Sequence, residues 1–251
     1  MRKAKIGTSP ESDIKIEPFE MWVPDEMNKD DLINQVREIY AYEVYKPIKA
    51  MNDIVVDLGA NVGMATLYLR KYAKKIYSLE PNPEFYESLV RNTNFDNVVH
   101  LNYGILDKGG VFTFFSPEDG IPQTLFPVTD KPITKNLNVQ MKTIDQFMEE
   151  NNIDHIDCLK IDTEGSEYPI FLGESFSKVV NKIDCIVGEG HFTPGGQIFP
   201  QMIEFILKDY GFKYRISKTP KPNLNQSIIY HNGDYTKKVT GNFWTNFIAW
   251  R

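Results

Sequence analysis

The residues with the clearest chemistry form the run DLGANVG at residues 57–63, which follows a short apolar segment. Gly59 and Gly63 let the backbone approach a ligand closely, and Gly59 can adopt a positive φ without steric cost. Their G-x-x-x-G spacing differs from the G-x-G-x-x-G of nicotinamide dinucleotide folds. Asp57 would repel a pyrophosphate and attract an ammonium group. The run therefore favours S-adenosylmethionine, which carries an ammonium and a sulfonium, over a pyrophosphate cofactor.

Glu80 ends the next apolar segment, 23 positions after Asp57. A carboxylate at the end of the second strand of such a unit can accept hydrogen bonds from both hydroxyls of a ribose. Both cofactor classes use this role, so Glu80 predicts a nucleoside without choosing between them. Asn82 and Pro83 then form a helix start, because asparagine caps helices and proline suits the first helical position.

Acidic residues also follow two apolar segments further along the chain. Asp162 and Glu164 come after the segment 158–161, and Glu189 and His191 come after 183–187. The carboxyl ends of neighbouring parallel strands lie along one edge of a sheet, where ligands bind, so these groups can meet there. Glu167, in contrast, has a structural explanation, because an acidic residue favours the start of a helix.

If S-adenosylmethionine donates its methyl group, these groups could activate the molecule that accepts it in two ways. His191 is the first candidate general base, because its unperturbed pKa lies near neutrality, and Asp162 is the second, with Glu164 beside them as a further catalytic candidate. Alternatively, Asp162, Glu164 and Glu189 could bind Mg²⁺ through hard oxygen ligands, and the ion would lower the pKa of the acceptor.

The elements that position these groups alternate between strand and helix in the first two thirds of the chain. Asp30 or Asp31 can cap a helix that runs to about Val44, and residues 117–137, with four prolines, predict a lid or binding loop. Strands are expected at 54–57, 76–79, 98–105, 111–116, 158–161, 183–187, 212–216, 227–230 and 247–250. Further helices are expected at 64–75, 83–92, 143–151 and 200–209.

This alternation predicts an α/β fold with a mostly parallel sheet and an antiparallel C-terminal strand. The length allows one large domain or two small ones, and we favour one structural unit. In this unit, residues 49–251 form the α/β domain, and residues 1–48 form an N-terminal segment and a helix that packs near its site. The net charge of −6 argues against nucleic acid as the main partner. No window reaches the ~20 apolar residues of a membrane span, and no leader is evident, so we expect a cytoplasmic protein.

Three stretches in order, VVDLGANVGMATLYL, SLEPNPEFYESLVRN and TIDQFMEENNIDHIDCLKIDTEGSEYPIFLG, resemble the FkbM family of S-adenosylmethionine-dependent methyltransferases. The resemblance covers about residues 40–195 and implies a single Rossmann-like methyltransferase domain, with a seven-stranded sheet and helices on both faces. It also implies cofactor-binding residues, namely Asp57, Gly59, Asn61 and Gly63 for the methionine half, Glu80 for the ribose, Asn82 for the adenosine side, and Gly104 and Ile105 near the adenine.

Family members commonly methylate oxygen, so the resemblance implies O-methylation of a sugar, glycan or secondary metabolite. A nitrogen or protein acceptor stays open, because a shared fold does not determine the acceptor. Two further alternatives are an NAD-type dehydrogenase, which the glycine spacing disfavours, and a cofactor-binding protein without catalysis. Residues 1–30 and the tail from about Thr219 match no family pattern, and the oligomeric state has no signal in the sequence.

Overall fold

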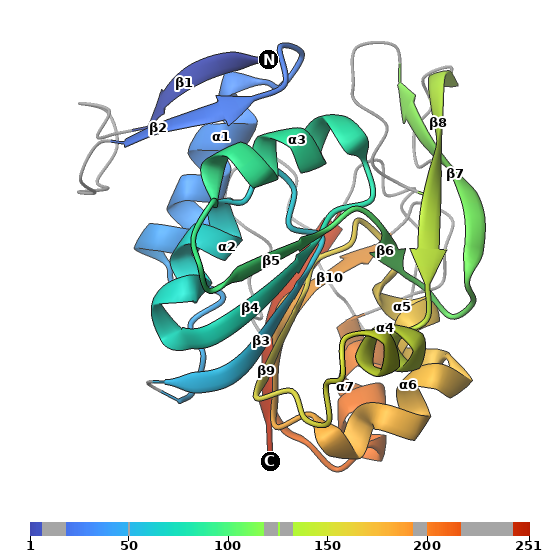
Figure 1. Ribbon diagram of the computed structural model, residues 1–251. Helices are drawn as coiled ribbons and strands as arrows, with labels where there is room; N and C mark the ends of the chain where they lie inside the picture. Colours follow the sequence, from blue (N-terminus) through green and yellow to red (C-terminus); the bar gives the residue numbers. More distant parts are fainter. Residues whose placement is uncertain (7–18, 50, 118–124, 126–132, 193–199, 217–242) are drawn as a thin grey trace, which may run out of the picture.

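A seven-stranded sheet forms the centre of the molecule in the computed structural model, which describes residues 1–6, 19–49, 51–117, 125, 133–192, 200–216 and 243–251 (Figure 1). In spatial order its strands are β11 (Lys213–Ile216), β12 (Phe243–Trp250), β10 (Cys185–Phe192), β9 (Cys158–Ile161), β3 (Asn52–Leu58), β4 (Ala73–Leu79) and β5 (Val98–Leu101). Only β12 runs antiparallel to its neighbours within this described sheet. This confirms the expected mostly parallel sheet with an antiparallel C-terminal strand.

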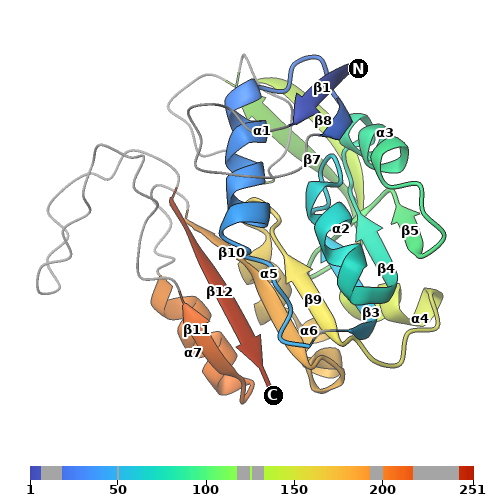
Figure 2. The same cartoon turned by 90° about the vertical axis from the view of Figure 1, so that its left-hand side faces the viewer.

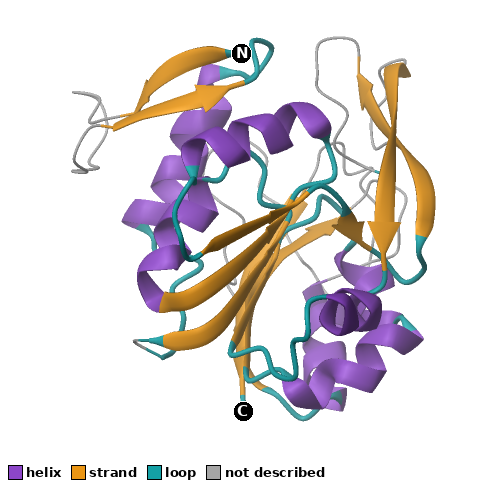
Figure 3. Ribbon diagram, in the orientation of Figure 1, coloured by secondary structure: helices purple, strands orange, loops and turns teal. Residues whose placement is uncertain are grey.

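The strands of the sheet centre are buried on both faces, which explains why they read as continuous apolar runs. Val55 belongs to one core cluster and Val56 to the other, and the same alternation separates Cys158 from Leu159. One cluster packs under α1 (Lys29–Val36), α2 (Met64–Leu69) and α3 (Pro83–Asn92), and the other under α4 (Ile144–Glu150), α5 (Glu167–Leu172), α6 (Glu174–Val179) and α7 (Pro200–Asp209). The strands therefore form a layer between two layers of helices (Figure 3).

The N-terminal segment forms a hairpin and a helix on the α2 side of the sheet (Figure 2). Strands β1 (Arg2–Ile6) and β2 (Phe19–Val23) pair antiparallel, and Asn92 of α3 binds both the N–H (2.7 Å) and the carbonyl (2.8 Å) of Trp22. The helix start expected at Asp30 or Asp31 is wrong, because Asn28 is the N-cap and accepts from the Asp30 N–H at 2.9 Å. After α1 the helix continues as a π-helical turn, Arg37–Ala41, and ends before Val44.

Strand pairing shortens the helix expected at 64–75. Helix α2 ends at Leu69, a 3₁₀ turn follows, and β4 begins at Ala73 opposite Asn52 of β3. Lys74 and Lys75 therefore lie in β4 and not in the helix expected at 64–75. Residues 70–75 are mostly good helix formers, so the pairing of β4 with β3 on one side and β5 on the other outweighs local helix propensity here.

A second sheet of three strands stands beside the main one and divides the strand expected at 98–105. Only β5 joins the main sheet, whereas β6 (Gly104–Ile105) pairs with β8 (Ile133–Lys142), which also pairs with β7 (Gly110–Pro117). Strand β8 replaces part of the loop expected at 117–137. Residues 118–124, 126–132 and the strand expected at 227–230 lie outside the described residues. In the described part of the chain, no helix has the length and apolarity needed to cross a membrane.

Candidate active site

A cavity of about 560 Å³ opens at the carboxyl ends of β3, β4, β9 and β10. This is the edge of an open α/β sheet at which ligands bind, and the volume lies in the range of small-molecule sites. We divide its lining into two groups and call them two sides of the cavity. The first side comprises the turn after β3, the end of β4 and β6, and the other side comprises α1, Tyr45, the segment after β9 and the end of β10.

The turn after β3 is held by close backbone packing. Gly59 has φ +76°, and a Cβ there would lie 1.9 Å from the backbone oxygen of Asp162, so only glycine fits. Gly63 has φ +91° and is the N-cap of α2, where a Cβ would lie 2.7 Å from Thr93. Asn61 also has positive φ, at 51°, and lines the cavity. The two glycines therefore let the turn pass close to β9 and α3.

Glu80 connects the turn to the end of β4. Its carboxylate accepts the backbone N–H groups of Asn61 and Asn82, each at 2.8 Å, and lies at the cavity wall with only 6% of the residue exposed. Burial raises the pKa of Glu80 to about 7, against the opposing effect of these two N–H groups. Each carboxylate oxygen keeps a second lone pair, so Glu80 can still accept hydroxyl groups of a ligand.

Asp57 does not line the cavity, although its negative charge led us to expect a contact with the ammonium group of the cofactor. It is fully buried, accepts the Thr66 hydroxyl at 2.7 Å and forms an ion pair with Lys160 at 3.0 Å. The same Lys160 ammonium donates to the Gly59 carbonyl at 2.8 Å, so it links the glycine turn to β9. The ammonium that Asp57 binds in this structure is thus a lysine of the chain, and a contact of Asp57 with a cofactor stays a prediction.

The remaining expected cofactor residues divide into two groups. Gly104 and Ile105, on β6, line the cavity. Asn82 is 1% exposed and caps α3 by accepting the Glu84 N–H at 2.9 Å, and like Gly63 it is not among the residues that line the cavity. Asn82 and Gly63 thus shape the site from behind its surface.

His191 stands among carboxylates on the other side of the cavity. Its Nδ1 lies 3.1 Å from Oε1 of Glu167. Its Nε2 lies 3.8 Å from Asp162, 3.7 Å from Glu164 and 3.9 Å from Glu189. Strands β9 and β10 are parallel neighbours, which brings the groups after β9 against the end of β10. The structure thus brings together all the residues proposed for acceptor activation.

The surrounding charge determines the protonation of His191. Burial alone would lower its pKa, but the carboxylates of Glu167 and Glu164, with the Glu167 hydrogen bond, raise the pKa of His191 well above its usual value. The side chain is 12% exposed, and the raised pKa favours its imidazolium form. It can accept a proton only after losing its own, which predicts an alkaline rise in activity if it is the base.

Glu167 does more than begin a helix. It is fully buried at the start of α5, and its carboxylate accepts from the backbone N–H of Thr163 (2.7 Å) and of Gly165 (3.1 Å) as well as from His191. Although burial would raise the pKa of Glu167, the His191 charge and these hydrogen bonds lower it. Glu167 therefore holds both the loop after β9 and the imidazole ring.

Tyr45 brings the N-terminal segment into the site. Its hydroxyl donates to Asp162 at 2.8 Å, its ring lies 5.4 Å from the Lys160 ammonium, and 2% of the residue is exposed. Burial and the nearby Asp162 and Glu189 charges raise the pKa of Tyr45 well above its usual value, so it stays a hydrogen-bond donor. Sequence reasoning did not place Tyr45 in the site and gave Glu167 only the start of a helix. The lysine inside the apolar strand CLKI is a local signal of a buried ion pair, which the structure shows between Lys160 and Asp57.

One atom each of Asp162, Glu164 and His191 lies within 4.8 Å of the others, a spacing that could hold a metal ion. This set differs from the expected Asp162, Glu164 and Glu189 by exchanging a carboxylate for an imidazole. A nitrogen ligand suits Zn²⁺ and other transition metals better than Mg²⁺.

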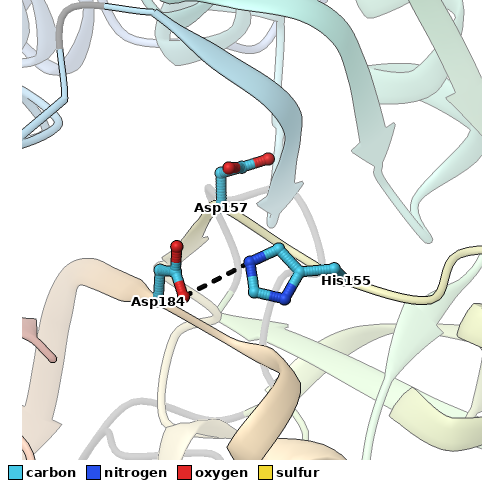
Figure 4. Close-up of side chains that lie close together, drawn as sticks. All are labelled: His155, Asp157 and Asp184. Atoms are coloured by element: carbon cyan, nitrogen blue, oxygen red, sulfur yellow. Dashed lines mark ion pairs between the residues drawn. The ribbon is translucent and has the colours of Figure 1, made fainter.

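A second histidine and acid cluster lies at the amino ends of the same strands (Figure 4). His155 lies 3.3 Å from Asp184, and Lys49 forms an ion pair with Asp184 at 2.6 Å. Asp157 accepts the N–H groups of Asp53 (3.1 Å) and Ile54 (2.9 Å) at the start of β3. These carboxylates already bind a lysine and a strand start, so we assign this cluster a structural role.

Comparison with known proteins agrees with this geometry. The family model of the methyltransferase FkbM domain matches residues 57–214. A methyltransferase of Sordaria araneosa, sdnD, is 28% identical over 197 residues, which are 64% of this chain and 74% of that protein. Methyltransferase 1 of Beauveria bassiana is 29% identical over 161 residues, 55% of this chain and 65% of that protein.

Two other similarities are more distant. An uncharacterized RNA methyltransferase of Bacillus cereus is 28% identical over 107 residues, which are 43% of this chain and 23% of that protein. The crystal structure of a candidate S-adenosylmethionine-dependent methyltransferase from Listeria monocytogenes superimposes with a TM-score of 0.50 and 10% identity, over 88% of this chain and 99% of that one. This structural likeness shows the Rossmann-like methyltransferase fold.

Proposed function

Because the chain belongs to the FkbM family of S-adenosylmethionine-dependent methyltransferases, we propose that it methylates a hydroxyl group of a sugar, glycan or secondary metabolite. The observation that carries the proposal is the cavity at the carboxyl edge, which joins the Gly59–Gly63 turn and Glu80 on one side to His191 on the other.

The residues on the first side fit S-adenosylmethionine, which supplies a methyl group on a cationic sulfur. Glu80 has free lone pairs for the ribose hydroxyls, and the carboxylates of the cavity favour a cationic ligand. Gly104 and Ile105 provide the wall where we place the adenine. Asp57 and Lys160 hold the turn in shape, so their contribution is to the geometry of binding.

The residues on the second side fit removal of a proton from a hydroxyl. An alcohol has a high pKa, so a positioned base accelerates its attack by about 10²- to 10⁴-fold. Glu167 holds Nδ1 of His191 and leaves Nε2 toward Asp162, Glu164 and Glu189, so the neutral ring can receive the proton at Nε2. Charge from the carboxylates then stabilises the imidazolium that forms.

A divalent cation at Asp162, Glu164 and His191 is the rival means of activation. A chelator separates the two, since it abolishes turnover through a metal and leaves turnover through a histidine base unchanged. Restoration of activity by one added cation after dialysis would identify the ion and transfer the role of the base to it. Retained activity in excess chelator would assign proton removal to the side chains.

The test of the function is incubation with labelled S-adenosylmethionine and a panel of sugars, glycans, nucleotide sugars, small amines and RNA. We expect label on a hydroxyl group of a sugar, glycan or nucleotide sugar, and the modified position is read from its fragments by mass spectrometry. Label transferred only to an amine or to RNA would refute O-methylation of a small molecule. Calorimetry with NAD and S-adenosylmethionine on the same preparation checks the donor.

A further inference from the structure

Helix α1 and the turn after it present a row of polar side chains to the cavity. Asp31, Asn34, Gln35 and Glu38 line it together, and their spacing of three, one and three residues puts them on one side of a helix. The apolar residues Leu32, Val36 and Ile39 are buried in the core cluster beneath α2, and of these three Ile39 also borders the cavity. The helix is therefore amphipathic, but its polar side faces a cavity at these four positions. We call these four residues the α1 wall.

The chemistry of the α1 wall is that of hydroxyl recognition. A carboxylate offers two accepting oxygens, and an amide offers both an acceptor and two donors, so neighbouring groups of this kind can bind several hydroxyls that each donate and accept. All four members of the α1 wall are carboxylates or amides. A wall of this composition matches a polyhydroxylated ligand better than an apolar one.

The charge of the cavity restricts the ligand further. Among the described residues that line it, seven are acidic, namely Glu26, Asp31, Glu38, Glu80, Asp162, Glu164 and Glu189, and the cationic ones are Lys160 and His191. The shortest ion pairs of both cations are with buried carboxylates outside that set, Lys160 with Asp57 at 3.0 Å and His191 with Glu167 at 3.1 Å. Within the set, Asp162, Glu164 and Glu189 lie 3.7–3.9 Å from His191, and Glu26 pairs with Lys135 at 2.6 Å. Phosphate sites use available Arg or Lys side chains, which this lining does not offer among the described residues.

From these observations, and resting on the proposed function, we infer that the α1 wall is the acceptor-recognition surface, which binds an uncharged polyhydroxylated acceptor and rejects its phosphorylated form. The wall lies outside the family match, which begins at residue 57. The family domain thus holds the donor side and the proton acceptor, while the preceding helix selects the acceptor. The negative charge of the cavity thus has two effects: it attracts the cationic methyl donor and repels a phosphorylated acceptor.

The test uses the full chain saturated with S-adenosylhomocysteine and, as probes, a panel of sugars with their phosphate esters. We expect calorimetry to detect an unphosphorylated member with about 100-fold tighter binding than its phosphate ester, because like charges in a poorly hydrated site repel. Equal or tighter binding of the esters would overturn the inference, and so would failure of every unphosphorylated member to bind. Binding without transfer of label from S-adenosylmethionine would instead refute the proposed function and leave the recognition surface established.

Variants locate the effect on the wall. Replacing both acids, Asp31→Asn with Glu38→Gln, should tighten binding of the phosphate ester about tenfold, whereas Asp30→Asn should not. Asp30 is the matched control, because it is the neighbouring acid in the first turn of α1 and does not line the cavity. Asn34→Ala with Gln35→Ala should weaken binding of the unphosphorylated member about tenfold. Unchanged affinity for S-adenosylhomocysteine verifies folding, and identical behaviour of the wall variants and Asp30→Asn would refute the assignment.

Discussion

The two histidine and acid clusters lie at opposite ends of the same strands and differ in almost everything except composition. Asp157 precedes β9 and Asp162 follows it, while Asp184 precedes β10 and His191 lies near its end. The His155 side chain is 47% exposed, and that of His191 is 12% exposed. The first cluster binds Lys49 and a strand start, and the second borders a cavity.

The difference shows that histidine and acidic residues close together do not by themselves form a ligand-binding site. At the amino ends, Asp184 pairs with Lys49 and Asp157 accepts the backbone N–H groups that begin β3, so both carboxylates hold the fold together. At the carboxyl ends, acids outnumber cations in the described lining, and burial strengthens the interaction of His191 with Glu167. The protonation of His191 is shifted as a result.

The largest expected effect separates the two histidines. His191→Ala should lower kcat by about 10²- to 10⁴-fold, because it removes the proton acceptor, and should leave the affinity for S-adenosylmethionine nearly unchanged. His155→Ala is the matched control and should keep the parent rate. Steady-state kinetics and calorimetry on both variants provide the measurement. Equal losses in the two variants would erase the distinction between the clusters.

A second prediction concerns Glu80 and the cofactor. Glu80→Ala should weaken S-adenosylmethionine binding by about ten- to a hundredfold, because hydrogen bonds to a charged group contribute about 1.5–3 kcal/mol. Its pKa of about 7 means that the accepting, ionised form is lost as the pH falls below neutrality. Parent affinity should therefore decline from pH 8 to pH 6, roughly one unit on either side of that value. The decline should be smaller in Glu80→Gln, as measured by calorimetry across this range.

Glu167 provides a sharper test of the His191 environment. The Glu167 carboxylate raises the pKa of His191, so Glu167→Gln should lower that pKa and move the alkaline rise in kcat toward lower pH. We expect a loss of about tenfold at the plateau, since the glutamine no longer stabilises the imidazolium. A pH–rate profile measures both. A purely structural role for Glu167 would lower the rate without displacing the profile.

The smallest effect is expected at the amino ends of the strands. Asp184→Asn should reduce the free energy of unfolding by about 0.2–1 kcal/mol, because it removes a partly exposed ion pair, and should not change turnover. The Lys49 hydrogen bond lowers the pKa of Asp184 in the folded protein. The ion pair therefore stabilises the fold at a pH above the usual aspartate pKa, and this stabilisation is lost as the pH falls through the lowered pKa of Asp184. Urea unfolding at neutral and acidic pH checks both statements.

Local sequence patterns were sufficient to predict the bounds of some helices and strands. The boundaries of α3 at Pro83–Asn92 and of β9 at Cys158–Ile161 follow from a cap, a proline and an apolar run, all of which act within a few residues. The hairpin of β1 and β2 could not be predicted, because its partner is α3, some 70 residues away in sequence. The extent of α2 was wrong for a similar reason, since pairing with β3 begins β4 at Ala73.

What the sequence by itself determined is the fold class, the family and the glycine turn that must pass close to other elements, because glycine spacing and apolar runs are local consequences of residue type. The tertiary structure alone decided which ammonium Asp57 binds, which carboxylate holds His191 and which helix closes the cavity. These are encounters between side chains far apart in the chain. Their pKa shifts depend on burial and on the sum of nearby charges, quantities that exist only once the strands are side by side.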